Sequence, residues 1–145
     1  MSGFRLDLSR MMNSLTQQVT KSRAMLGVYA DTASRKLETE AKTNHPWQNR
    51  SHDAESRLKG SYEWQGDNVR LALSHGVDYG VFLEKGTNPH IITARNGGYL
   101  FWDGASHPVK QVNHPGSRPY PIIMPTIEGC GPEILRGLNC LFGSR

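Results

Sequence analysis

Hydrophobic or small residues in the first third of the chain recur at alternating intervals of three and four. This spacing brings them to one face of an α-helix. The stripe consists of Leu15, Val19, Ser22, Leu26, Ala30, Ala33, Leu37 and Ala41. It predicts a long amphipathic helix that ends at Asn44 to Pro46, because a proline disfavours helical geometry in the residue before it. A shorter helix over Leu6 to Met12 is predicted to precede it.

After residue 60 the pattern changes from helical to alternating. Hydrophobic residues now occupy every second position, as a strand with one buried face requires, at Val69, Leu71 and Leu73. We therefore expect a hairpin with strands Ser61 to Gln65 and Asn68 to His75, joined by a turn at Gly66 and Asp67. A short helix over Ala54 to Leu58 is expected before the hairpin.

The second half of the chain predicts shorter elements separated by turns. A helix over Tyr79 to Lys85 is expected to stop at Gly86, because glycine accepts the positive φ that is common past a helix end. A flexible turn is expected at the Asn-Gly-Gly tract over residues 96–98. Three further strands are expected, at His90 to Thr93, Tyr99 to Trp102 and Val109 to Val112.

The C-terminal segment completes the predicted fold. Helix-compatible spacing runs from Ile122 to Phe142, but Gly129, Gly131 and Pro132 interrupt it, so we expect two helical pieces. The 145 residues are enough for one domain, over residues 1–145. The predicted fold class is α+β, with a long N-terminal helix and a C-terminal helix packed on a mainly antiparallel four- to five-stranded sheet.

Composition bears on the expected partners, the cellular compartment and the state of the cysteines. Hydrophobic residues make up 37% of the chain, with 15 glycines and 8 prolines, so the protein is expected to rely on partner subunits for part of its burial. The sequence has no apolar run of about eighteen residues and no signal-peptide pattern at its start, which favours a reducing cytoplasm and no membrane. Cys130 and Cys140 lack metal-binding spacing and are expected to be free, buried thiols.

Neither the charge distribution nor any motif indicates a catalytic, metal-binding or cofactor-binding site. The net charge of +4 is scattered and never forms a run of five basic residues, so charge alone identifies no partner. The six histidines match no zinc-binding spacing, and neither a GxSxG element nor a phosphate-binding glycine loop is present in the sequence. We therefore expect no enzymatic activity, no metal site and no cofactor.

The segment around Tyr99 combines aromatic residues with a nearby basic one. Tyr99, Phe101 and Trp102 beside Arg95 could stack nucleobases. Packing is the favoured interpretation. In an alternating strand Tyr99 and Phe101 share one face while Leu100 and Trp102 share the other, so both faces are apolar. One face would then be available as an intersubunit surface.

Three segments of the chain carry recognisable motifs in a fixed order. SHGVDYGVFLEKGTNPH, from Ser74 to His90, has a strand, an aromatic short helix and a Glu-x-Gly-Thr motif. VNHPGSRPYPIIMPTIE, from Val112 to Glu128, has a His-Pro-Gly segment and a proline-led start to the C-terminal helix. PWQNRSHDAESRLKGSYEW, from Pro46 to Trp64, has an arginine-bearing turn and the first hairpin strand. In these motifs and their order the chain resembles the neck and tail-completion proteins of long-tailed bacteriophages. It departs from that family at residues 51–53, Ser-His-Asp, where the family has glycine.

The resemblance implies a structural virion protein of the phage neck, assembled in the host cytoplasm. It implies a homo-oligomeric ring, most simply a hexamer, that terminates the tail tube and joins tail to head. The implied partners are the tail tube protein and a head-completion (stopper) protein, with genomic DNA passing through the lumen. One alternative is another neck component, a head-closure or minor capsid protein. A further alternative, motivated by the net charge, the aromatic strand and the histidines, is a small DNA-binding protein.

The candidate interface residues lie in the first two of these segments and between them. Tyr79, Phe82 and Leu83 share a helical face and are expected to pack on the sheet. Glu84 is expected either to accept backbone amides or to reach Arg118, with an exposed glutamate as the alternative. We interpret the set as packing, turn and interface residues: Tyr79, Phe82, Glu84, Gly86, Thr87, Phe101, Trp102, His114, Pro115, Gly116 and Arg118.

Overall fold

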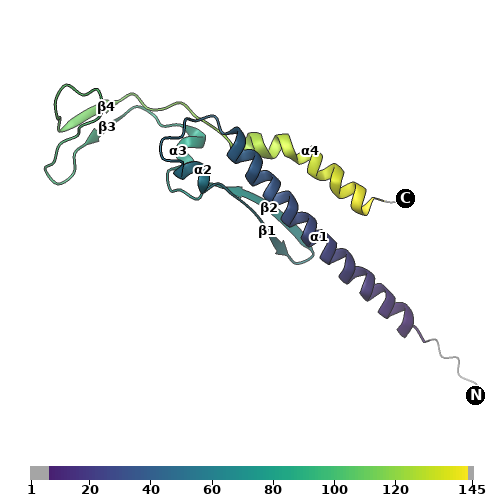
Figure 1. Ribbon diagram of the computed structural model, residues 1–145. Helices are drawn as coiled ribbons and strands as arrows, with labels where there is room; N and C mark the ends of the chain where they lie inside the picture. The colour runs from purple at the N-terminus through teal and green to yellow at the C-terminus, as the bar shows by residue number, and fades with distance from the viewer. Residues whose placement is uncertain (1–6, 144–145) are drawn as a thin grey trace, which may run out of the picture.

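The longest element is helix α1 (Ser9–Asn44), and the hairpin and the last helix pack against it (Figure 1). The computed structural model describes residues 7–143. The helix has 36 residues and is therefore ~54 Å long at ~1.5 Å per residue. It ends where predicted, because His45 precedes Pro46 and adopts extended geometry, with φ −63° and ψ 139°.

The separate N-terminal helix predicted over Leu6 to Met12 is wrong. Met11 and Met12 belong to the first turn of α1, which continues without a break, while Leu6 lies outside the described residues. No residue between Ser9 and Met12 is a glycine or a proline that would interrupt the helix there.

A hairpin packs beside α1, as predicted. Strands β1 (Lys59–Gln65) and β2 (Asn68–Ser74) pair antiparallel, with Gln65 opposite Asn68 across the turn. Gly66 in this turn has φ +64°, a conformation that glycine adopts without strain. The short helix α2 (Asp53–Ser56) precedes the hairpin and overlaps the helix predicted there.

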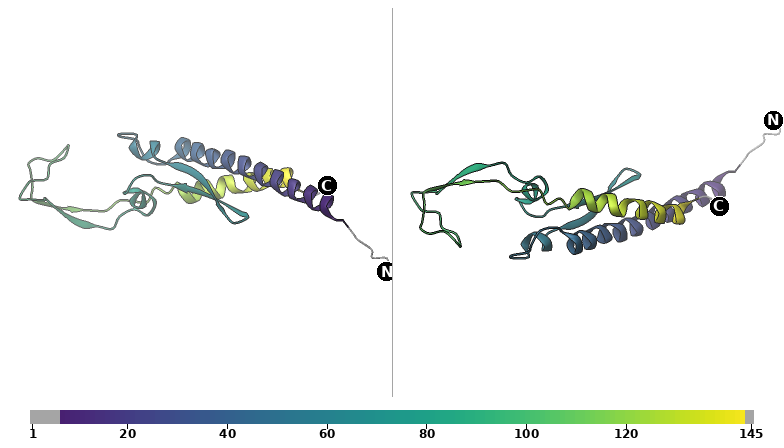
Figure 2. Two further views of the ribbon diagram at one scale, coloured as in Figure 1. Left: turned by 90° about the horizontal axis from the view of Figure 1, so that it is seen from below. Right: turned by 90° about the horizontal axis from the view of Figure 1, so that it is seen from above.

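The predicted sheet of four to five strands is wrong, because the strands form two separate sheets. Helix α3 (Gly80–Lys85) follows the hairpin, and strands β3 (His90–Thr93) and β4 (Gln111–His114) then pair only with each other. The predicted strand over residues 99–102 is reduced to one bridge, Leu100 to Val109. Residues 88–116, which we call the arm, project from the body, so no described strand lies beside β3 and β4 to extend the sheet (Figures 1 and 2).

The core lies between α1, the hairpin and the start of α4 (Ile123–Phe142). Its cluster of buried residues contains Leu37, Ala41, Leu58, Leu73, Ile122 and Cys130. Trp47, Leu71, Ile123 and Ile134 pack around this cluster. The α1–α4 contact is also fixed by polar groups, since the Tyr29 hydroxyl donates to the carbonyl of Ile134 at 2.5 Å. An ion pair joins Lys36 to Glu133.

Helix α4 is a single helix, so the prediction of two helical pieces is wrong. Pro132 lies inside it and removes one backbone hydrogen bond, which costs about 3 kcal/mol in a helix interior. Gly131 precedes this proline and lacks the Cβ atom that would clash with the proline ring, so helical geometry is less restricted there. Packing of Cys130 and Ile134 in the core holds the helix together on both sides of Pro132.

The two cysteines are free, as predicted, but only one is buried. Cys130 lies in the core, and burial raises the pKa of its thiol. Cys140 is exposed near the end of α4, contrary to the prediction. Within residues 7–143 no helix is both long enough and apolar enough to cross a membrane.

Close packing of β1 on α1 predicts the cost of adding a methyl group at Gly60. A Cβ atom there would collide with the carbonyl oxygen of Ser34 and lie 3.2 Å from the Cβ of Glu38. We expect Gly60→Ala to lower the free energy of unfolding by about 1–3 kcal/mol, measured by chemical denaturation. The matched control is Gly129→Ala in α4, where nothing lies within 4 Å, and it should be neutral or stabilise by up to about 1 kcal/mol. Equal denaturation midpoints for the two variants would contradict this packing.

Candidate functional site

The two segments that carry most of the resemblance meet where the arm joins the body. Thr87 and Ser117 exchange both backbone hydrogen bonds, each at 3.0 Å, and their hydroxyls also lie 3.0 Å apart. Nearby, the backbone N–H of Tyr120 donates to the carbonyl of Leu83 at 2.7 Å. We call this region, residues 83–88 with residues 114–123, the motif junction. It fixes the base of the arm relative to α3 and α4.

Glu84 is the central polar group of the motif junction. Its Oε1 atom accepts the backbone N–H groups of Ile122 at 2.9 Å and Ile123 at 3.0 Å, where α4 begins. These N–H groups have no acceptor within the helix, and a negative charge at a helix N-terminus is favourable. Of the two contacts predicted for Glu84, the one with backbone amides is present. The one with Arg118 is not, because that guanidinium lies over the Tyr120 ring, 4.8 Å from its centroid.

His75 supports Glu84 from the end of β2. Its Nε2 atom lies 2.9 Å from Oε1 of Glu84, and its side chain is only 8% exposed. Among the described residues, its Nδ1 atom has no hydrogen-bond partner although it is buried. A hydrogen on Nδ1 would therefore have no acceptor, whereas a hydrogen on Nε2 is donated to the carboxylate. Sequence reasoning missed His75, although it continues the alternation of Val69, Leu71 and Leu73.

Two glycines allow the chains of the motif junction to approach closely. Gly86 has φ +71° and Gly116 has φ +85°. A Cβ atom on Gly86 would collide with the carbonyl oxygen of Ser117, and one on Gly116 would collide with that of Thr87. Pro115 follows His114, the last residue of β4, and the ring of His114 lies 5.0 Å from that of His90 across the arm. The side chain of His114 also accepts the backbone N–H of Gly116 at 3.0 Å through Nδ1.

The segment Pro46 to Trp64 and the motif junction form the two sides of a cleft with a volume of about 820 Å³. The residues that line it are Pro46, Trp47, Gln48, Arg50, Leu83, Ser117, Arg118 and Tyr120. At the point where the sequence departs from the family, His52 has φ +59° and ψ 8°. This left-handed conformation is one that glycine adopts without strain, so the backbone here suits the glycine of the family pattern.

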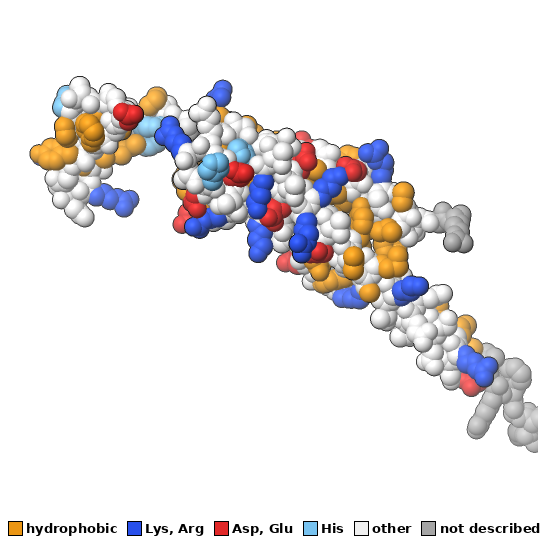
Figure 3. Space-filling view, in the orientation of Figure 1, with side chains coloured by type: hydrophobic (Ala, Val, Ile, Leu, Met, Phe, Trp, Pro, Cys, Tyr) orange, Lys and Arg blue, Asp and Glu red, His pale blue; other side chains and the backbone are white. Residues whose placement is uncertain are grey.

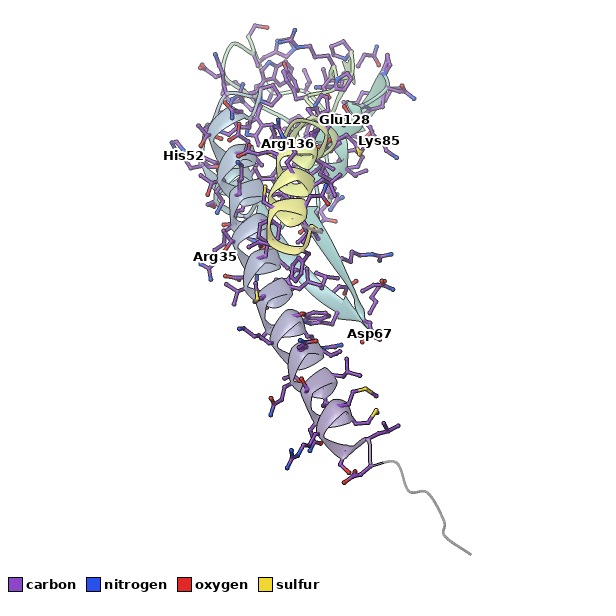
Figure 4. All side chains as sticks on the ribbon, turned by 90° about the vertical axis from the view of Figure 1, so that its right-hand side faces the viewer. Arg35, His52, Asp67, Lys85, Glu128 and Arg136 are labelled. Carbon is purple, nitrogen blue, oxygen red and sulfur yellow. The ribbon has the colours of Figure 1, made fainter. Side chains whose placement is uncertain are left out.

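Side-chain hydrogen bonds hold the turn around His52. The carboxylate of Glu55 is contacted by His52 Nδ1 at 3.1 Å and by the side-chain amide of Asn49. The His52 contact holds the pKa of Glu55 below its usual value, and His45 adds to this effect. These groups lie on the surface beside α2, where Figure 4 shows His52 projecting outward. They stabilise a turn and bring no ligand to a defined position.

The predicted packing of Tyr79 and Phe82 on the sheet is wrong. Tyr79 is 43% exposed and Phe82 56% exposed, while Leu83 alone of the three is partly buried. The sheet that they were expected to cover is not there, because the hairpin has only two strands and is covered by α1. The Tyr79 hydroxyl instead donates to Asp53 at 3.3 Å. The pKa of Tyr79 is raised, first by desolvation and then by this carboxylate.

Phe101 and Trp102 lie in the arm, apart from the motif junction. They are 67% and 47% exposed, and Tyr99 beside them is 66% exposed with Lys110 over its ring at 5.9 Å. The favoured interpretation of core packing is therefore wrong for these residues. Figure 3 shows hydrophobic side chains gathered on the arm and again between α1 and the C-terminal end of α4.

The hydrophobic side chains between α1 and the end of α4 line a groove that the sequence analysis did not predict. Between α1, the tip of the hairpin and α4, the groove has a volume of about 700 Å³. Its apolar lining, which defines the α1–α4 groove, is Val19, Leu26, Trp64, Leu138 and Phe142. Val19 and Leu26 belong to the apolar stripe predicted on α1. The stripe does not show where α4 ends, so it could not predict that these two residues line a groove.

The polar groups and glycines of the motif junction are engaged with the chain's own elements. Among residues 7–143, no group of three or more histidine, cysteine or acidic residues is placed to hold a metal ion. Glu84 and His75 are both engaged in holding α4, and both glycines serve close backbone approach. Comparison of the chain with protein-family models, with curated proteins and with solved structures found no match.

Removal of the Glu84 carboxylate tests the motif junction. Glu84→Ala would leave two N–H groups at the start of α4 and the His75 ring without their acceptor. We expect a loss of about 2–3 kcal/mol in the free energy of unfolding, and a smaller loss for Glu84→Gln, whose amide oxygen can still accept. The control is Glu128→Ala, an exposed carboxylate on α4 (Figure 4), which should change stability by less than about 0.5 kcal/mol. A Glu84→Ala variant as stable as the control would contradict the assigned role.

Two glycines with the same positive φ differ in how much a methyl group would cost. Gly86 and Gly97 both have φ +71°, but only Gly86 has neighbours that a Cβ atom would strike. Gly86 also has ψ −173°, in a region of backbone conformation that glycine alone populates. We expect Gly97→Ala to cost about 1 kcal/mol, because a Cβ atom there meets nothing within 4 Å. Gly86→Ala should cost at least about 2 kcal/mol more, because the motif junction must open and the backbone is strained further. Thermal or chemical denaturation of both variants measures the difference, and similar losses would argue against close contact at Ser117.

Proposed function

We propose that this protein is a structural subunit of a bacteriophage neck, which forms a ring that terminates the tail tube and joins the tail to the head. The resemblance of the three segments supports this proposal, and so does their arrangement. Residues from all three line one cleft, with Glu84 and the Thr87–Ser117 pair holding two of them together. In this proposal the motif junction keeps the shape of the subunit, while exposed surfaces make the contacts.

The observation that carries the proposal is the amount of surface that the single chain leaves exposed. Its accessible surface is 11628 Å². A compact monomer of 16.2 kDa would expose about 7,500 Å², so the excess is about 4,200 Å². Interfaces between subunits that are always associated bury about 2,000–5,000 Å² in total. The excess therefore corresponds to the area that each subunit of a ring buries against its two neighbours.

The buried residues support the same proposal. Within the described chain, the buried hydrophobic set is small and includes three alanines: Ala30, Ala33, Leu37, Ala41, Leu58, Leu73, Ile122 and Cys130. The first part of α1, residues 9–25, is exposed throughout. Most of a helix's stability in proteins comes from packing of its apolar face, so a further packing partner is expected for this segment.

The oligomeric state tests the proposal. Multi-angle light scattering on the purified chain should find discrete oligomers, most simply hexamers, or assembly that increases with concentration. Cryo-electron microscopy of assembled virions should then place the subunit between the tail tube protein and the head-completion protein, around the DNA. A position next to the portal adaptor instead would favour a head-closure or minor capsid protein.

A stable monomer would contradict the ring. If such a monomer also bound duplex DNA with a steep dependence on salt, the alternative of a small DNA-binding protein would be favoured. A ring whose lumen only lets DNA slide requires no tight binding at physiological salt.

A further inference from the structure

The molecule carries two apolar surfaces that no residue between 7 and 143 covers, and they lie towards its two ends. At one end, the exposed apolar residues of the arm are Ile91, Tyr99, Phe101 and Trp102, between 47% and 67% exposed. Towards the other end lies the α1–α4 groove, and the views of Figures 1 and 2 agree that the arm extends away from it. Continuous exposed apolar surface of this kind is uncommon on monomers.

We propose that the arm of each copy binds in the α1–α4 groove of the next copy, and that this contact builds the ring. The inference rests on the proposed function and identifies the contact that would make the oligomer. The occupant of the groove is a second copy of this chain, which inserts the aromatic residues of its arm. Val19 on α1, Trp64 at the hairpin tip and Phe142 on α4 receive them.

The dimensions of the groove suit this occupant. Its volume of about 700 Å³ lies within the range that proteins use to enclose drug-sized apolar groups. Aromatic side chains bury about 150–250 Å² each, so the three rings of Tyr99, Phe101 and Trp102 supply a large part of one standard interface side of about 800 Å². The arm is thus matched in size to the groove.

The charges at the groove allow an apolar arm to cover it. Arg23 and Asp67 stand at its rim and pair with each other at 2.8 Å, and Arg23 also lies over the ring of Trp64, 4.2 Å from the centroid. Figure 4 shows Asp67 at the tip of the hairpin, beside α1. Because these two charges already neutralise each other and remain at the edge, closing the groove leaves no charge buried alone.

The placement of the two surfaces favours a head-to-tail contact over a symmetric pair. If two copies joined groove to groove, the contact would be self-complementary and end at a dimer, with both arms still exposed. Joining arm to groove covers both surfaces on every copy and can repeat until the ring closes. It also accounts for the excess surface, since each subunit would bury area at two separate places.

Cysteine cross-linking tests this contact in the full-length protein. Two variants are made in a Cys140→Ser background, one with Asp103→Cys in the arm, next to Trp102 but outside the inserted aromatic set, and one with Asn139→Cys at the groove. Mixed and oxidised, they should form a disulfide-linked dimer that contains one copy of each. A chain carrying both changes should form a ladder that ends at the ring size. The matched control replaces Asn139→Cys by Thr39→Cys, an exposed position of α1 that lines a different pocket, and should not cross-link to the arm.

A second measurement does not depend on cross-linking geometry. Trp102→Ser, at a half-exposed position of the arm, should raise the concentration needed for assembly about tenfold while the circular dichroism spectrum stays unchanged. Phe82→Ser, at a half-exposed aromatic position on α3 outside both surfaces, is the control and should leave assembly unchanged.

The results that would contradict the arm-to-groove contact differ from the result that would contradict the ring. If wild-type oligomers persist but Asp103→Cys pairs only with itself, or the groove pairs with another groove, the arm-to-groove contact is wrong and the ring proposal stands. If Trp102→Ser assembles at the same concentration as the wild-type chain, the arm is not the occupant of the groove and the inference is overturned. If the wild-type chain stays monomeric at all concentrations, the ring itself is wrong, and the inference with it.

Discussion

The contact on which the rest of the structure depends is the one between the Glu84 carboxylate and the first backbone N–H groups of α4. It joins residues 38 and 39 positions apart and connects the short helix α3 to the start of the last helix. The carboxylate can hold this position because α4 presents free N–H groups there, in the part of the helix where a negative charge is most favourable. His75 fixes the carboxylate from β2, so the hairpin, α3 and α4 meet at one oxygen atom. The same contact positions the base of the arm, because Gly86 and Thr87 come directly after α3 in the chain.

Local chemistry explains the parts of the fold that the sequence predicted. The α1 stripe, the Gly66 turn, Pro46 and Gly86 each act through neighbours a few residues away, so their effect can be read from spacing alone. His90 to Thr93 was likewise predicted with the bounds that β3 has. The continuous helix at Pro132 was missed, because a local rule said that it should break and the packing on α1 that prevents this is a long-range effect.

Long-range arrangement explains the rest of what was missed. Alternation at Tyr99 to Trp102 predicted a strand with two apolar faces, yet the arm leaves the body and only Leu100 forms a bridge. Tyr79 and Phe82 were assigned to a buried face that depended on a larger sheet. A contact with backbone amides was one of the alternatives left open for Glu84, and its partners at Ile122 and Ile123 required the order of the segments in space. The α1–α4 groove was missed for the same reason, since its walls come from three distant parts of the chain.

The residues that hold the shape and the residues left exposed belong to different sets. Glu84, His75, Gly86 and Gly116 are engaged with their own chain, through hydrogen bonds or close backbone contact. Tyr99, Phe101, Trp102 and Val19 contribute little to the core and stand in solvent. Exposed apolar residues stabilise nothing in an isolated chain, and they raise the risk of aggregation. In the ring proposed above, these residues would be covered by neighbouring copies. A subunit whose small core is completed in this way would couple its stability to ring formation.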